Sequence, residues 1–129
     1  MITLQYRKIS QYLAILLLQF FYPTAIAHHS GNMFDREQIV ELVGIVREFQ
    51  WTSPHIWIQV LVISETGITE EWSIEGGVPN RLFRSGWRPN TFKPGHQVIL
   101  QAYPMRDGAR AGLFIGAKLN DGSILGEFN

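Results

Sequence analysis

Three successive runs of apolar and polar residues predict three β-strands in the first part of the chain that follows its N-terminal segment. The first run, residues 39–49, carries apolar side chains on both faces and has Gly44 in its middle. The runs at residues 55–63 and 68–75 alternate more simply, with one apolar face each. A glycine inside a strand is typical of a bulge or a sharp bend. We therefore expect a bulge or a sharp bend of the first strand at Gly44.

The rest of the chain predicts one short helix followed by more strands. The helix is expected at residues 78–85, because Pro79 suits a first helical turn and Gly86 suits the end of a helix. Further strands are expected at residues 97–103, 113–119 and 123–125. In the middle one of these, one face is expected to carry Leu113, Ile115, Ala117 and Leu119. Asp121-Gly122 is a strong signal for a two-residue hairpin before the last strand.

This order of elements predicts an all-β domain with one short helix, folded as a small OB-like closed β-barrel. The helix lies between strands 3 and 4, as in that type of barrel. The bend at Gly44 matters because one strand must serve both halves of a closed sheet. A β-sandwich is the alternative, but it requires more strands than the pattern offers.

Residues 1–27 have the pattern of a cleaved signal peptide. Arg7-Lys8 precedes a short apolar run at residues 13–21, and Ala25 and Ala27 stand at the −3 and −1 positions. The run is shorter than the ~20 residues that span a bilayer, so we expect no stable membrane span after cleavage. An uncleaved N-terminal anchor is the alternative. Export by this peptide predicts a periplasmic protein whose single domain covers residues 28–129.

Composition adds two limits to this picture. The leader contains two of the 11 basic residues and none of the 11 acidic ones, so residues 28–129 carry a formal charge of −2. Such a balance argues against nucleic acid as a partner, because that affinity depends mainly on neutralising phosphates. The chain has no cysteine, so no disulfide can support the fold even in an oxidising compartment.

A metal site is the sharpest chemical hypothesis that the sequence supports. Cleavage after Ala27 would leave His28 as the first residue, with its free amine beside its own imidazole. His29 or the distant His55 could supply a third nitrogen donor. Such donors favour Cu(II), with Zn(II) behind. The alternative is that the terminal histidines touch nothing and that His55 is a strand-end residue bonded to a carbonyl or to water.

A second set of residues suggests a face for a ligand or a partner. Trp57 falls opposite the isoleucine-rich face of its strand, and Trp51 lies close before it. Basic residues at spacings of three and four, Arg81, Arg84 and Arg88, would lie near one face of the helix if it persists. They could meet an anionic lipid, a glycan or an envelope protein. The alternatives are core packing for the tryptophans, which fits Trp72 best, and a solvated face for the arginines.

No catalytic residues are expected, because the chain lacks a nucleophile elbow, a phosphate loop, an HExxH helix and a cysteine pair. Glu71 and Glu75 share one face of a strand, but four residues of strand span ~13 Å, which is too far for paired acid–base work. The absence of these motifs argues against an enzyme.

Seven short stretches together resemble a known family. They are Ala27-His28-His29-Ser30, Met33-Phe34-Asp35, residues 43–51, Pro54-His55-Ile56-Trp57, residues 72–77, Gly86-Trp87 and Lys93-Pro94-Gly95. They are similar to an uncharacterised exported bacterial family, domain of unknown function 6152 (DUF6152). The resemblance covers essentially all of residues 28–129 and implies an exported β-rich domain, with no activity attached.

Three functional hypotheses follow. The first is a non-enzymatic periplasmic binding module that holds Cu(II) or another divalent metal near His28, His29 and His55. The second is an interaction module of the bacterial envelope for a protein or glycan, with Trp51, Trp57 and the three arginines at the contact. The third is a copper enzyme, in which the terminal histidine chelate activates oxygen.

Overall fold

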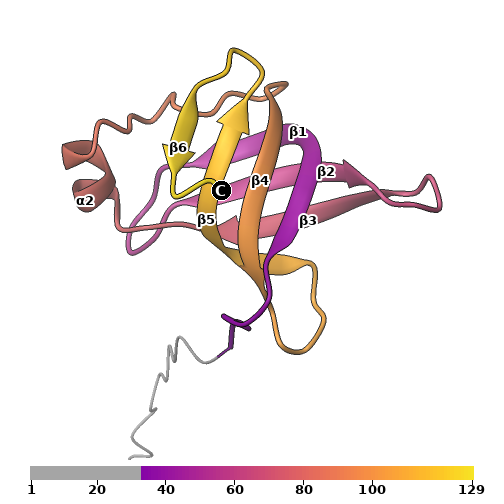
Figure 1. Ribbon diagram of the computed structural model, residues 1–129. Helices are drawn as coiled ribbons and strands as arrows, with labels where there is room; N and C mark the ends of the chain where they lie inside the picture. Colours follow the sequence, from indigo (N-terminus) through magenta and orange to yellow (C-terminus); the bar gives the residue numbers. More distant parts are fainter. Residues whose placement is uncertain (1–32) are drawn as a thin grey trace, which may run out of the picture.

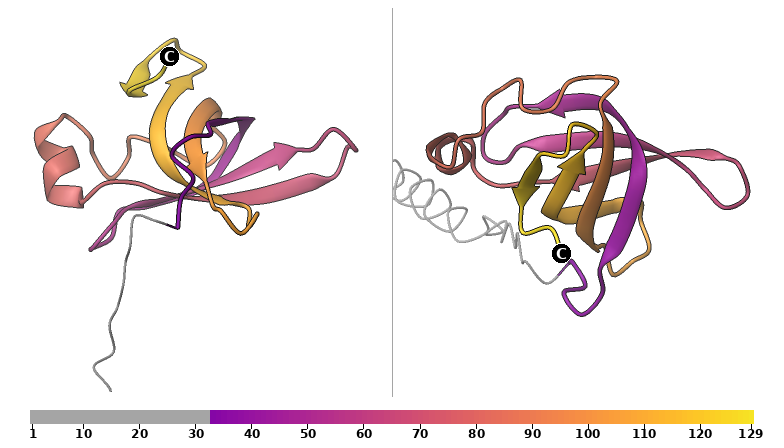
Figure 2. Two further views of the ribbon diagram at one scale, coloured as in Figure 1. Left: turned by 60° about the horizontal axis from the view of Figure 1, so that its bottom comes forward. Right: turned by 45° about the horizontal axis from the view of Figure 1, so that its top comes forward.

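A computed structural model describes residues 33–129, and the expected leader at residues 1–27 lies outside them. The strands are β1 (Val40–Gln50), β2 (Trp57–Ile63), β3 (Thr69–Glu75), β4 (Gln97–Pro104), β5 (Ala111–Leu119) and β6 (Ile124–Gly126), and the helix is α2 (Pro79–Arg84) (Figure 1). Every expected element is present, with bounds that agree to within two residues. Figures 1 and 2 both show α2 standing to one side of the strands.

The strands close into a barrel, which confirms the predicted fold and rules out the sandwich. Their order in the sheet is β3-β2-β1-β4-β5-β6, and β3 also pairs with β5 in parallel, from Ser73 with Ala111 to Glu75 with Leu113. The right-hand view of Figure 2 shows the strands curving round a common interior. The neighbouring pairs along the sheet are antiparallel. The parallel seam between β3 and β5 is therefore the contact that closes the sheet on itself.

The first strand does serve both halves of the sheet, because β1 pairs with β2 and with β4. Gly44 lies in the part of β1 that pairs with both. Gly44 is paired with Val62 of β2 and with Val98 of β4. A Cβ atom there would collide with the carbonyl oxygen of Leu61 and would lie 2.9 Å from Cγ1 of Val60. The expected bulge is displaced, because the register shifts between Val46 and Glu48. Gly44 thus provides close approach of two strands, and the irregularity follows it.

The core is formed by the inward faces of the strands and by aromatic residues from the segment after α2. The predicted inward face of β2 is confirmed, since Ile58 and Val60 are fully buried together with Ile56. Trp87 is 5% exposed and forms edge contacts with Phe92 and Phe114, at centroid distances of 5.7 and 5.3 Å. Trp72 is half-buried and packs against this cluster. Trp87 is therefore the most buried of the tryptophans.

One face assignment was wrong. The alternation from Leu113 to Leu119 is interrupted, because Gln101 pairs with Gly116 while Ala102 pairs with Phe114. Ile115 is the extra residue of this bulge. As a result Phe114 packs against the core, and Leu113 and Ile115 do not share the inward face of the strand's second half. A bulge shifts the side-chain parity by one residue, which a pattern of period two does not reveal.

Within residues 33–129, no helix is long and apolar enough to cross a membrane.

Candidate functional site

His55 is held at the barrel end by backbone contacts between the β1–β2 loop and the end of β3. The amide of Ile56 donates to the carbonyl of Gly77 over 3.1 Å, and the amide of Gly76 donates to the carbonyl of Ile56 over 2.9 Å. Thr52 adds a hydroxyl bond of 3.1 Å to the carbonyl of His55. These bonds place the His55 side chain beside the last residue of β3, which is Glu75.

The imidazole of His55 forms a close pair with Glu75, its Nδ1 atom lying against Oε1 of the carboxylate. The side chain of His55 is 38% exposed and that of Glu75 is 17% exposed, so the carboxylate is the inner member of the pair. Within the described chain, Nε2 of His55 has no hydrogen-bond partner. A neutral His55 with its proton on Nδ1 can therefore direct an unshared electron pair on Nε2 outward.

This geometry is common in histidines that bind metals. Such a histidine donates its second ring N–H to a carboxylate, which sets the tautomer and the direction of the ring. Among residues 33–129, no three His, Cys, Asp or Glu side chains come close enough to hold a metal ion. His96 is engaged elsewhere, where its Nδ1 accepts a bond of 3.3 Å from the Lys93 amide. Within residues 33–129 the barrel therefore offers one oriented imidazole and no set of three donors.

Each of the three glutamates of β3 lies against a basic side chain. The pairs are Glu70 with Arg110, Glu71 with Arg47 and Glu75 with His55. The Arg110 guanidinium lies 2.6 Å from Glu70, and its hydrogen bond lowers the pKa of that carboxyl. It ties β3 to the start of β5 beside the parallel seam. In the described part of the chain, Glu75 is the one glutamate of β3 that is paired with a histidine and not with an arginine.

His55 was expected as a site residue from the sequence, and Glu75 was not. Glu75 was considered only as a partner for Glu71 on its own strand. It lies 20 positions after His55, and the contact depends on the pairing of Trp57 with Glu75 in the β2–β3 hairpin. The turn at Thr66-Gly67 and the alternation of both strands could have indicated this register. His28 and His29 lie outside the described residues.

The expected partner face is spread over two regions. Trp57 is half-buried on the outer side of β2, and Trp51 forms an edge contact with Phe49 and packs against the core. Arg81 and Arg84 are exposed on α2. Within residues 33–129, no ring contact, hydrogen bond or ion pair joins these tryptophans to the arginines of α2.

Arg88 is anchored by its own segment. Its guanidinium lies 4.0 Å from the ring centre of Phe83 and donates to the carbonyls of Phe83 and Trp87. Stacking and backbone bonds therefore orient a cation that meets no carboxylate in the described part of the chain.

Comparison with protein families gives one assignment. Residues 17–115 match the model of the family of unknown function DUF6152. Neither the comparison with curated proteins nor that with solved structures finds a match. Because the matched region covers most of the 129 residues, the resemblance seen in the sequence is confirmed. The chain therefore belongs to the DUF6152 family, and it folds as a closed β-barrel with one short helix between strands 3 and 4.

Proposed function

We propose that this protein is a non-enzymatic binding module of the periplasm that holds Cu(II) through His55 and the histidines at its processed N-terminus. The single observation that carries the proposal is the His55–Glu75 pair, which orients an imidazole and leaves its Nε2 atom open. Amine and imidazole nitrogens are donors that suit Cu(II) over Zn(II). The amine and ring of His28 form the chelate, and His55 or His29 supplies the third nitrogen.

The length of the chain permits His28 to meet His55. Phe34 pairs with Met105, the Met105 amide donates to Ala111, and Ala111 pairs with Ser73. These contacts place four segments side by side, from the one that contains Phe34 to β3, which contains Ser73 and Glu75. Three steps between strands span ~14 Å, and Glu75 lies ~7 Å further along β3. The barrel curves, so the straight distance is shorter than this path. Six extended residues from Phe34 to His28 reach ~20 Å.

Processing after Ala27 is part of this proposal, because only cleavage there places an amine on His28. Protein recovered from the periplasm should have the intact mass of residues 28–129. A stable full-length chain in the membrane fraction would contradict the cleavage and remove the proposed chelate.

Titration calorimetry with Cu(II) on residues 28–129 tests the metal site. One alanine added ahead of His28 moves the amine away from the imidazole and should weaken binding at least ~10-fold. Glu75→Gln should weaken it ~10–100-fold, as expected for a carboxylate that orients a ligand. His55→Ala should weaken it at least as much.

The affinity for Cu(II) should also fall as the pH is lowered through the range in which free histidine gains a proton, because a protonated nitrogen cannot bind the metal.

His96→Ala is the matched control, because His96 belongs to the Lys93 turn and should leave Cu(II) binding unchanged. If the variant with the added alanine binds Cu(II) as tightly as the native protein, the proposal of a terminal chelate is wrong. If His55→Ala behaves like His96→Ala, the barrel contributes nothing, and copper on the terminal histidines is adventitious.

A second candidate function is an interaction module for an anionic glycan of the envelope. It is favoured by Arg81, Arg84 and Arg88, which are exposed and lack carboxylate partners within residues 33–129. Replacing all three with glutamine should abolish retention on a sulfated polysaccharide column at low salt while Cu(II) affinity is unchanged. Equal retention of the variant and the native protein would reject this function.

A further inference from the structure

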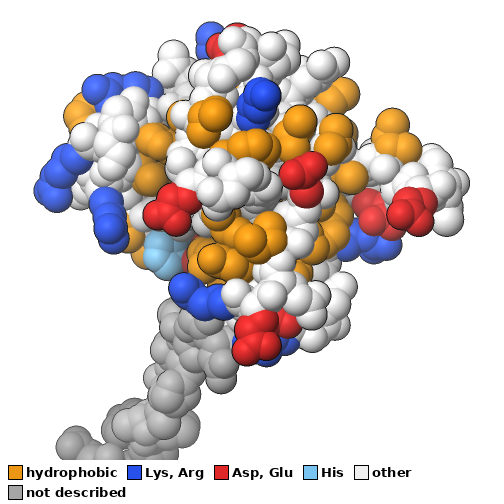
Figure 3. All heavy atoms as spheres, viewed as in Figure 1, with side chains coloured by type: hydrophobic (Ala, Val, Ile, Leu, Met, Phe, Trp, Pro, Cys, Tyr) orange, Lys and Arg blue, Asp and Glu red, His pale blue; other side chains and the backbone are white. Residues whose placement is uncertain are grey.

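The outer side of β1 and β2 carries aliphatic residues that the described chain leaves uncovered. Val43 and Ile45 are 62% and 45% exposed, and Ile63 of β2 is 72% exposed. Val43 and Ile45 alternate along β1 with Leu42 and Val46, which face the core. The strand is therefore apolar on both sides. Figure 3 shows hydrophobic side chains gathered over β1 and the neighbouring β4. Contiguous apolar surface of this kind marks a binding site more often than isolated exposed residues do.

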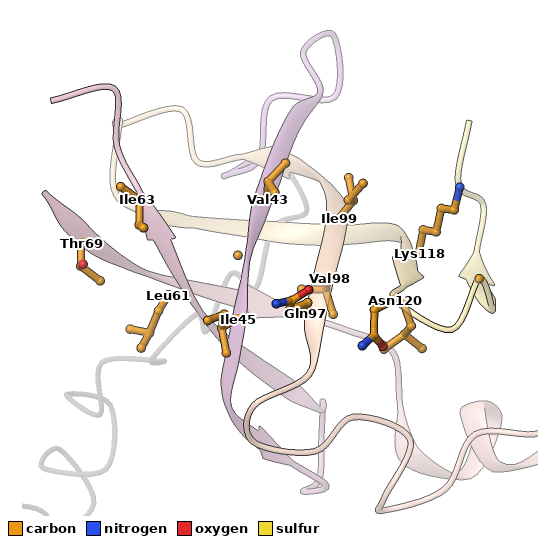
Figure 4. A pocket seen from close by; sticks show the side chains of 13 residues that line it. Val43, Ile45, Leu61, Ile63, Thr69, Gln97, Val98, Ile99, Lys118 and Asn120 are labelled. Atoms are coloured by element: carbon orange, nitrogen blue, oxygen red, sulfur yellow. The ribbon is translucent and has the colours of Figure 1, made fainter. Parts of the chain in front are cut away.

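This surface is hollowed into an open groove of about 870 Å³. Figure 4 shows Val43 and Ile45 on β1, with Ile63 to one side of them and Ile99 and Lys118 to the other. Gly44, which has no side chain, also lines the groove. The volume falls within the ~300–1,000 Å³ of small-molecule sites.

The charge in the groove is one-sided. Lys118 is the single charged residue among those that line it, and the other polar ones are the neutral Thr69, Gln97 and Asn120. Lys118 is exposed, is paired with Ile99 across β5 and β4, and forms no ion pair with any residue of 33–129. A fitting occupant is therefore apolar along most of its length and carries one negative charge at one end.

We propose that this groove binds a single-chain fatty acid, with the alkyl chain along Val43, Ile45 and Ile63 and the carboxylate at Lys118. A second copy of the chain docking through the same face would be a poorer occupant. No carboxylate lines the groove, so a copy of the same face supplies no counter-ion for Lys118. This site is separate from His55 and Glu75, neither of which lines it.

The probes are octanoate, decanoate and dodecanoate below their micelle concentrations, with dodecanol as the uncharged counterpart. Calorimetry on metal-free protein should show affinity rising about two- to fourfold for each added methylene, as expected for burial in a half-open apolar site. Dodecanoate should bind about 2- to 5-fold more tightly than dodecanol, the range of an ion pair at an exposed lysine. Affinity that does not depend on chain length would overturn the proposal.

Three variants locate the site. Ile45→Gln should reduce binding of dodecanoate and dodecanol alike, and Lys118→Gln should reduce only dodecanoate, bringing it to the level of dodecanol. Ile124→Gln is the control, since Ile124 is 58% exposed on β6 and lies outside the groove. It should bind like the native protein. All three side chains are partly or largely solvated, and thermal unfolding of each variant checks that the barrel persists.

Two results would reject the fatty acid. One is equal loss of dodecanoate binding in Ile45→Gln and Ile124→Gln. The other is a dimer in sedimentation that Ile45→Gln abolishes, together with no dodecanoate binding, which would assign the groove to a second copy. His55→Ala should leave dodecanoate binding unchanged, so failure of the metal site and failure of this site are distinguishable.

Discussion

Replacing Trp87 with alanine should lower the free energy of unfolding by about 3–5 kcal/mol, the usual loss for a large buried aromatic. Trp87 is 5% exposed and forms edge contacts with the rings of Phe92 and Phe114. Its amide also donates to the carbonyl of Leu82 in α2. The indole therefore joins the segment after the helix to the barrel core, and its removal leaves a cavity that backbone bonds at this point prevent from closing.

Chemical denaturation followed by circular dichroism measures this loss. Trp57→Ala is the matched control, because it removes the same side chain from the half-buried outer side of β2. It should cost less than half as much as Trp87→Ala. Equal losses for the two variants would mean that the core does not centre on the aromatic cluster around Trp87.

Gly44→Ala should destabilise the barrel by about 3 kcal/mol, at the upper end of the range for overpacking. The new Cβ would meet the carbonyl oxygen of Leu61, which belongs to a strand backbone and cannot rotate away as a side chain can. Gly44 is also paired on both sides, with Val62 and Val98. A shift of β1 to relieve the collision would therefore disturb two ladders.

The neighbouring Val43→Ala serves as the control. Val43 is 62% exposed, so its truncation should change the unfolding free energy by less than ~1 kcal/mol. If Gly44→Ala costs no more than Val43→Ala, β1 and β2 do not approach as closely as described. In that case the bend of β1 would depend on the bulge between Val46 and Glu48 alone.

Of the two residues that form the candidate metal site, the sequence indicated His55 and not Glu75. His55 stands out because it directly follows Pro54 at the start of the expected strand 55–63 and because the chain has only four histidines. Glu75 does not stand out, since nothing local distinguishes it from Glu70 or Glu71. Its role depends on its contact with His55, which the pairing of β2 with β3 brings about. Pairings between distant segments are decided by the barrel and not by spacing.

The sequence by itself determined the kind and position of the elements. Alternation along residues 55–63 separates a core face from an outer face, and Pro79 with Gly86 bounds a short helix, because these preferences act between near neighbours. The closed barrel also followed from the order of the elements. For the same reason the apolar face expected for β2 faces the core, with Ile56, Ile58 and Val60 fully buried and Val62 partly buried against them.

Only the tertiary structure decided how the strands register. The bulge at Ile115 brings Phe114 into the core, and the shift in β1 falls after Val46 and not at Gly44. The parallel β3–β5 seam and the groove on the outer side of β1 likewise arise when a twisted sheet closes on itself. Register is a condition on all strands together, so a pattern that reports only on neighbours along the chain does not contain it.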